Sequence, residues 1–221
     1  MSYEVEVLQA RAWARAASGD MGTARTHLEA AVELGRVTGD LLGATRALHG
    51  MARMGRARQV VDEMGALAPK VDDELSAARF SYTAAAADKD SQALAAAAAR
   101  FEELGALLYA AEALGESAVH LRRDGSGRVA EATQQAAARL LPRCEGAVTP
   151  FVRAIGARAR LTPAELDTAL QAATGSTDKQ IAEMMHLSVR TVENRLHRAY
   201  QKLGLSHRRD LAEALRDLPG I

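Results

Sequence analysis

The 221-residue sequence contains one cysteine and lacks any apolar run long enough to cross a membrane. With Cys144 alone, an intrachain disulfide is impossible, which fits a reducing compartment. A membrane-spanning helix needs about 18 consecutive apolar residues, and a secretion signal needs a basic start followed by an apolar run. Neither pattern is present, so we predict a soluble, cytoplasmic protein with no membrane partner.

Residues that favour β-sheets are also scarce. The chain has 3 Phe, 4 Tyr, 1 Trp and only three isoleucines, against 48 alanines. Alanine is the best helix former, whereas aromatic and β-branched residues are enriched in strands. We therefore predict an all-α fold, and the length allows one large or two modest domains.

The net charge is zero, but it is unevenly distributed. Residues 153–221 carry 11 basic and 8 acidic side chains, and the preceding residues carry 17 and 20. An excess of three positive charges at the carboxyl end is modest, and does not by itself identify a nucleic-acid binder.

Patterns that support catalysis or metal binding are missing. The six histidines show no metal-ligand spacing with one another or with Cys144; they are at positions 27, 49, 120, 186, 197 and 207. No lysine follows a glycine, so there is no phosphate-binding GxxxxGK[ST] loop. We predict that the chain is not an enzyme and holds neither a metal nor a cofactor.

The segment Ser188–Leu203 predicts a helix with two different faces. Val192, Leu196, Ala199 and Leu203 recur at steps of four, three and four, which places them on one apolar face. Ser188 is a good N-cap, and Gly204 follows at a typical C-terminal position. The opposite face is rich in polar and charged side chains, which is typical of a DNA-contacting helix or of an ordinary amphipathic surface helix.

Three shorter helices surround this segment in the sequence. Thr162-Pro163-Ala164-Glu165 is a strong helix start, and that helix is expected to run to about Ala173 and stop at Gly175. Thr177–Gln180 opens a second helix, joined to Ser188 by a tight turn, and Ser206 caps a fourth. Four short helices with this connection predict a helix-turn-helix unit.

The runs LTPAEL and GSTDKQIAEMMHLSVRTVENRLHRAYQKLGLSHR closely resemble the DNA-binding domain of LuxR/GerE-type bacterial transcription regulators. The resemblance covers about residues 160–216 and preserves every gap. The matching positions are Leu161, Thr162, Glu165, Gly175, Lys179, Ile181, Ala182, Ser188, Thr191, Val192, Lys202, Leu203, Gly204 and Arg208.

This resemblance implies roles for the outward-facing residues. Glu193, Asn194 and His197 match the positions that read bases, although a lone histidine can also be a merely solvated side chain. The expected phosphate contacts are Lys179, Ser188, Arg190, Thr191, Arg195, Arg198 and Lys202, of which Lys202 alternatively neutralises its helix terminus. The family usually has a basic residue at the position of Glu193, so the acid either sharpens base choice or weakens binding.

The resemblance also implies a homodimer on two half-sites of double-stranded DNA. Pairing is expected through the fourth helix, with Leu211, Leu215 and Leu218 as interface candidates. The alternative is that these leucines only close the core of the small domain, and we expect Leu211 and Leu215 to do both.

The residues before this unit read as helical repeats. Turn clusters separate eight expected helices that start near residues 5, 20, 40, 54, 72, 89, 106 and 126, with a period of about 34 residues. That period is typical of tetratricopeptide repeats. Small residues are expected at the close approaches of paired helices, at Ala24, Ala57, Ala93 and Ala130, followed on the same face by Leu28, Val61 and Ala97. The fourth repeat departs from this pattern and has Gln134 at that position.

Degenerate repeats before such a DNA-binding unit resemble the last third of the large MalT-like, ATP-binding LuxR regulators. We predict a repeat domain at 1–145, a linker at 146–160 with a helical turn around 151–155, and the DNA-binding domain at 161–221. The repeats are expected to sense a protein or small-molecule effector. The sequence leaves open whether the chain is complete or a fragment of a larger regulator. It also leaves open a protein-interaction scaffold with a vestigial DNA unit, or a sigma-factor-like promoter reader.

Overall fold

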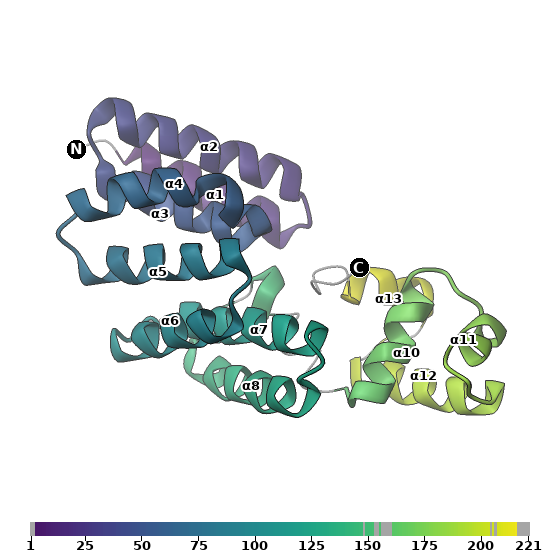
Figure 1. Cartoon of the computed structure of the whole chain (residues 1–221). Coiled ribbons are helices and arrows are strands. Elements are labelled where there is room, and N and C mark those ends of the chain that lie inside the picture. The colour runs from purple at the N-terminus through teal and green to yellow at the C-terminus, as the bar shows by residue number, and fades with distance from the viewer. Residues whose placement is uncertain are drawn as a thin grey trace. The chain divides into compact units, whose positions relative to one another are not determined.

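The computed structural model describes residues 3–147, 149–152, 155, 161–203, 205 and 207–215. Every regular element among these residues is helical, and the chain divides into two compact units, Met1–Pro150 and Phe151–Ile221 (Figure 1). The predicted all-α class, with paired helices followed by a helix-turn-helix unit, is confirmed. No helix in the described part of the chain is long and apolar enough to span a membrane.

The first unit is a series of helical hairpins in which each helix packs against the next (Figure 1). Its α-helices are α1 (Glu4–Ala17), α2 (Met21–Thr38), α3 (Leu41–Met51), α4 (Ala57–Leu67), α5 (Glu74–Asp88), α6 (Ser91–Glu103), α7 (Leu107–Arg123) and α8 (Gly127–Leu140). The segment η1 (Ala52–Arg56) follows α3 and contains a kink at Met54 and Gly55, where the backbone is not helical. The 3-10 turns η2 (Ala68–Lys70) and η3 (Leu141–Arg143) follow α4 and α8. All eight predicted helices are present within three residues of their expected starts.

Aspartates at the turns explain where many of these helices begin. Asp20, Asp40, Asp73 and Asp90 precede α2, α3, α5 and α6, and each carboxylate accepts a hydrogen bond from a backbone N–H in the first turn, at 2.8–3.0 Å. A side-chain oxygen at this position satisfies a donor that the helix itself leaves unpaired. The turn clusters in the sequence therefore mark real helix boundaries.

The close packing of the hairpins depends on small residues, largely where they were predicted. Ala24, Ala57 and Ala130 are buried. Ala93 is only half-buried, and its neighbour Leu94 is fully buried instead. Because Ala97, one turn further on, is buried as predicted, the difference is local to the start of α6, where the larger leucine fills the core position.

The second row of predicted packing positions shows a similar deviation. Leu28 and Ala97 are buried, whereas Val61 is half-buried and the adjacent Val60 takes its place in the core. Gln134, the departure from the pattern, is also buried. The rotation of each helix is set by its neighbours, and the degenerate repeat pattern did not specify it.

A buried ion pair lies inside the first unit. Arg53 in η1 donates from Nε to Glu112 Oε2 at 2.6 Å and from Nη2 to Glu112 Oε1 at 2.9 Å, and the two side chains are 6% and 4% exposed. The Arg53 guanidinium lies 4.1 Å from the ring centroid of Trp13 and 4.8 Å from that of Tyr109. We call Trp13, Arg53, Tyr109 and Glu112 the inner cluster. Short, bidentate, charge-assisted bonds connect η1 to α7, and the Trp13 ring beside the guanidinium adds α1.

The inner cluster is bordered by a buried histidine. The ring of His49 contacts those of Tyr82 and Tyr109, with centroids 5.2 and 4.8 Å apart. Burial, reinforced by the charges of Arg53 and Arg79, lowers the pKa of His49 well below its ordinary value. His49 is therefore neutral near pH 7 and acts as an aromatic core residue.

The structure predicts that breaking the buried ion pair lowers the free energy of unfolding much more than breaking an exposed one. Arg53→Met leaves the Glu112 carboxylate buried without its cationic partner, and is expected to lower the free energy of unfolding by about 3–5 kcal/mol. Arg58→Met breaks an ion pair between Arg58 and Asp88, whose two side chains are 79% and 70% exposed. This variant is expected to lower the free energy of unfolding by only about 0–1 kcal/mol. Urea unfolding followed by the fluorescence of Trp13, the one tryptophan, measures both.

The double variant Arg53→Met/Glu112→Leu serves as the control for this prediction. It removes both charges and should recover a substantial part of the stability lost in Arg53→Met. Equal losses in the Arg53 and Arg58 variants would contradict a structural role for the buried pair.

Candidate nucleic-acid interface

The second unit contains the four predicted short helices. They are α10 (Pro163–Ala173), α11 (Asp178–Met184), α12 (Val189–Leu203) and α13 (Arg209–Leu215). α10 packs against α11, α12 and α13, and α11 packs against α12. The helical turn expected around 151–155 has helical backbone at residues 150–152 and 155, the positions described there.

Two capping boxes fix the starts of α10 and α11. Glu165 N donates to Thr162 Oγ1 at 3.3 Å, while Thr162 N donates to Glu165 Oε2 at 2.9 Å. Thr177 and Gln180 make the same reciprocal pair at 3.3 and 2.8 Å. Both boxes were predicted from the sequence, as was the stop of α10 at Gly175, whose φ of +91° suits glycine.

The turn between α11 and α12 is tight, as predicted. His186 adopts φ of +54°, which is uncommon for a residue with a side chain, and Leu187 N donates to Ala182 O at 2.8 Å. Leu187 packs partly buried against the core of the unit. Ser188 Oγ then accepts from Thr191 N at 3.1 Å and caps α12, so the short turn sets the direction of this helix relative to α11.

One face of α12 closes the core of the second unit. Val192, Leu196 and Ala199 are at most 2% exposed, and Leu203 is partly buried, which confirms the predicted apolar face. They pack in one cluster with residues of α10, α11 and α13, namely Leu166, Ala169, Ala172, Ile181, Ala182, Leu211 and Leu215. This packing fixes the rotation of α12 about its own axis.

The opposite face of α12 is open to solvent. Glu193, Asn194 and His197, the three predicted base contacts, are all exposed. Of the predicted phosphate contacts, Lys179, Ser188, Arg190, Arg198 and Lys202 are exposed, and Thr191 and Arg195 are half-buried. The three base candidates and Arg190 fall at steps of three and four residues, so they share one face of the helix. We call Arg190, Glu193, Asn194, His197 and Gln201 the outer face.

A side-chain contact on the outer face was not predicted. Gln201 Nε2 lies 3.0 Å from His197 Nε2, one turn along the helix. The two side chains can share one hydrogen bond, in which the donor and acceptor roles depend on the tautomer of His197. The spacing of four residues in the sequence was the available signal.

Lys202 is held by a contact within the unit. Its Nζ donates to Glu165 Oε2 at 2.6 Å, and the Glu165 side chain is only 6% exposed. Partial burial acts to raise the pKa of Glu165, but the hydrogen bonds from Lys202 and Thr162 outweigh it and lower that pKa below its ordinary value. A phosphate contact by Lys202 has to compete with this ion pair. The sequence pattern matched both residues but did not indicate that they meet.

A second ion pair joins the start of α13 to the start of α11. The Arg208 guanidinium, just before α13, donates to Asp178 on α11 and to the backbone oxygen of Ser176. Arg208 was a matched position without an assigned role. Its contacts tie the start of the fourth helix to the start of the second.

Two of the leucines proposed for dimerisation lie in the core. Leu211 and Leu215 are both 0% exposed and pack in the core cluster of the unit, and a role for them at a dimer interface stays a prediction. Leu218, Gly204 and Ser206 lie outside the described residues. The exposed positions on α13 include Arg209 and Ala212. Dimerisation itself stays a prediction.

Comparison with known families identifies the second unit. Residues 159–215 match the model described as bacterial regulatory proteins, luxR family. No curated protein and no solved structure matches the chain.

The ion pair between Glu165 and Lys202 predicts a pH dependence of stability. Because the folded-state pKa of Glu165 is lowered, its contribution is present above the unfolded value of about 4.3 and is lost as pH falls through the folded value. Glu165→Gln keeps the capping box but removes the charge. It should destabilise the unit by about 1–2 kcal/mol at pH 7 and by less at pH 3.

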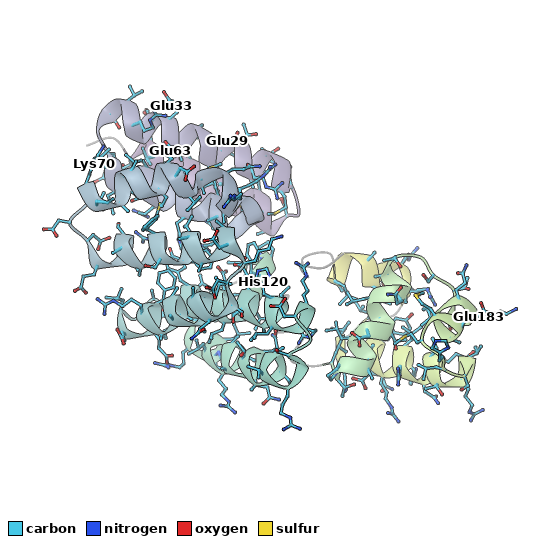
Figure 2. All side chains as sticks on the ribbon, viewed as in Figure 1. Glu29, Glu33, Glu63, Lys70, His120 and Glu183 are labelled. Atoms are coloured by element: carbon cyan, nitrogen blue, oxygen red, sulfur yellow. The ribbon has the colours of Figure 1, made fainter. Side chains whose placement is uncertain are left out.

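The measurement is urea unfolding followed by the methyl NMR signal of Ile181, a core residue of this unit. Glu183, exposed on α11 (Figure 2), provides the matched control, since Glu183→Gln removes the same charge at the surface. A difference between Glu165→Gln and the native chain that persists unchanged at pH 3 would contradict the assignment.

Proposed function

We propose, from the premise that residues 159–215 form a LuxR-type helix-turn-helix DNA-binding domain, that the chain is a transcription regulator that reads the major groove with α12. A domain of this type implies DNA-binding transcriptional regulation, and an all-helical region precedes it. The observation that carries the proposal is the division of α12 into a buried apolar face and an exposed outer face.

The chemistry of the outer face suits base recognition. The major groove of B-DNA admits one α-helix, and the donors, acceptors and thymine methyl at its edges distinguish the base pairs. Asn194 can pair with adenine through two hydrogen bonds, and Glu193 can accept from the amino group of cytosine. His197 has a ring N–H that can donate to a guanine edge or to a phosphate.

Basic residues around the outer face supply the phosphate contacts. Lys179, Arg190 and Arg198 are exposed, and none of the ion pairs found among the described residues involves them. Such contacts fix the register on the duplex and make affinity depend on salt. Ser188, Thr191 and the N-terminus of α12 add hydroxyl and N–H donors beside the strand. Arg195, half-buried, and Lys202, paired with Glu165, are weaker members of this set.

The proposal includes a homodimer on two half-sites. One small domain makes few phosphate contacts, and helix-turn-helix proteins commonly gain affinity by binding half-sites about one helical turn apart. With Leu211 and Leu215 in the core, exposed residues of α13 such as Arg209 and Ala212 can contribute to the pairing surface.

The hairpins α1–α8 are proposed as the part that binds an effector or a partner protein. Stacked helical hairpins form extended surfaces used for binding. A ligand of the folded chain stabilises it, by about 2.7 kcal/mol at a concentration one hundred times Kd. Thermal-shift screening of the full chain should find such a compound, with hydrogen exchange protection in α1–α8 and none in α10–α13. Protection confined to α10–α13 would contradict the assignment.

Two substitutions should separate base reading from phosphate binding. Asn194→Ala is expected to relax sequence preference, with a loss of about 1–3 kcal/mol on the preferred site and little change on random duplex. Lys179→Ala is expected to weaken binding to all duplexes and to reduce the dependence of log K on log salt by about one unit. A selection of bound DNA fragments with the purified chain defines the preferred site, and gel shifts at two salt concentrations measure both effects.

Arg128 offers a charge-matched control for Lys179. It is exposed on α8 in the first unit, so Arg128→Ala removes one positive charge from outside the DNA-binding unit. Its binding should equal that of the native chain. Equal effects of Asn194→Ala on preferred and random DNA would refute base reading by this residue.

A further inference from the structure

Thr149, the residue before the last one of the first unit, has its side chain in the interior of that unit. Thr149 lies beyond α8 and η3, one residue before the division at Pro150–Phe151, and it is only 8% exposed. Its Oγ1 donates to Glu112 Oε1 at 2.8 Å. A segment that connects two units is ordinarily exposed, because burial of its polar groups requires partners. Here the partner is a buried carboxylate on α7.

Glu112 links this segment to the inner cluster. Its Oε1 accepts from Thr149 Oγ1 and from Arg53 Nη2, while its Oε2 accepts from Arg53 Nε. Three hydrogen-bond donors thus converge on the Glu112 carboxylate, two from Arg53 in η1 and one from Thr149 near the end of the unit. Without Thr149, Glu112 still keeps both bonds from Arg53. The threonine can therefore detach without leaving a buried charge unpaired.

We propose that Arg53, Glu112 and Thr149 form an exit anchor, a contact that fixes where the chain leaves the repeat unit and transmits the state of the repeats to the DNA-binding unit. Arg53 and Glu112 are 59 residues apart, on η1 and α7, and Thr149 is a further 37 residues on. A ligand that shifts α7 relative to η1 moves the Glu112 carboxylate, to which Thr149 is bound. The coupling step rests on the proposed regulatory function, whereas the anchor itself does not.

The anchor is tested by hydrogen exchange on the full chain with Thr149→Val, which keeps the shape of the side chain and removes the donor. Exchange in the peptide that contains Thr149 should become roughly 10- to 100-fold faster, the factor that corresponds to loss of one hydrogen bond to a charged group, about 1.5–3 kcal/mol. Exchange in α7 should stay unchanged, because the bonds between Arg53 and Glu112 remain.

Thr83→Val provides the matched control. Thr83 is 0% exposed on α5, and its Oγ1 donates to Arg79 O within its own helix at 2.8 Å. This variant loses a buried threonine hydroxyl in the same unit but keeps the exit anchor, so the Thr149 peptide should exchange as in the native chain. Unchanged exchange in Thr149→Val, or equal acceleration in both variants, would overturn the anchor.

Coupling is tested by adding duplex DNA that carries the preferred site. If the anchor is coupled to DNA binding, DNA should change the exchange rate of the Thr149 peptide in the native chain by at least about threefold, and Thr149→Val should change the DNA affinity. A faster-exchanging variant with native affinity would overturn the coupling and leave the anchor in place. If the native chain bound no DNA, the proposed function would fail, while the exchange result without DNA would still decide the anchor.

Discussion

The second unit depends on the requirement that a single helix serve two environments. α12 buries Val192, Leu196 and Ala199 in a cluster shared with α10, α11 and α13. Because successive residues are about 100° apart, this packing sends Glu193, Asn194 and His197 to solvent. Any slip of the helix by one residue would bury a polar side chain and expose an apolar one. The orientation of the outer face is thus fixed by the hydrophobic core on the opposite side of α12, and not by contacts on the outer face itself.

Ion pairs reinforce this orientation at the periphery of the unit. Lys202, at the end of α12, is bonded to Glu165 in the first turn of α10, and Arg208 connects the start of α13 to that of α11. Each pair joins helices that are distant in sequence. Both pairs are partly shielded from solvent, so they are screened less than pairs on the open surface. A unit with a small core gains from such connections because its hydrophobic stabilisation is limited.

The first unit combines alanine-rich packing with a polar interior. Small residues such as Ala24 and Ala130 allow the helices to approach closely, while the inner cluster places a buried ion pair between η1 and α7. Aromatic rings lie beside the Arg53 guanidinium, and Glu112 satisfies its donors. Interactions between distant repeats are not required by a simple stack of hairpins, in which each repeat contacts only its neighbours. The Arg53–Glu112 pair therefore gives this unit a connection that repeat periodicity does not supply.

Local patterns in the sequence were sufficient to predict the helices, their approximate starts and the two faces of α12. Capping residues such as Thr162 and Thr177 and the spacing of Val192, Leu196 and Ala199 act over a few residues, so these features need no long-range contact. Which distant groups meet depends on how the helices pack. The tertiary structure paired Lys202 with Glu165, placed Leu211 and Leu215 in the core and brought Thr149 to Glu112. Those contacts join residues separated by long stretches of chain, and their partners depend on how whole helices rotate and pack, which no local pattern records.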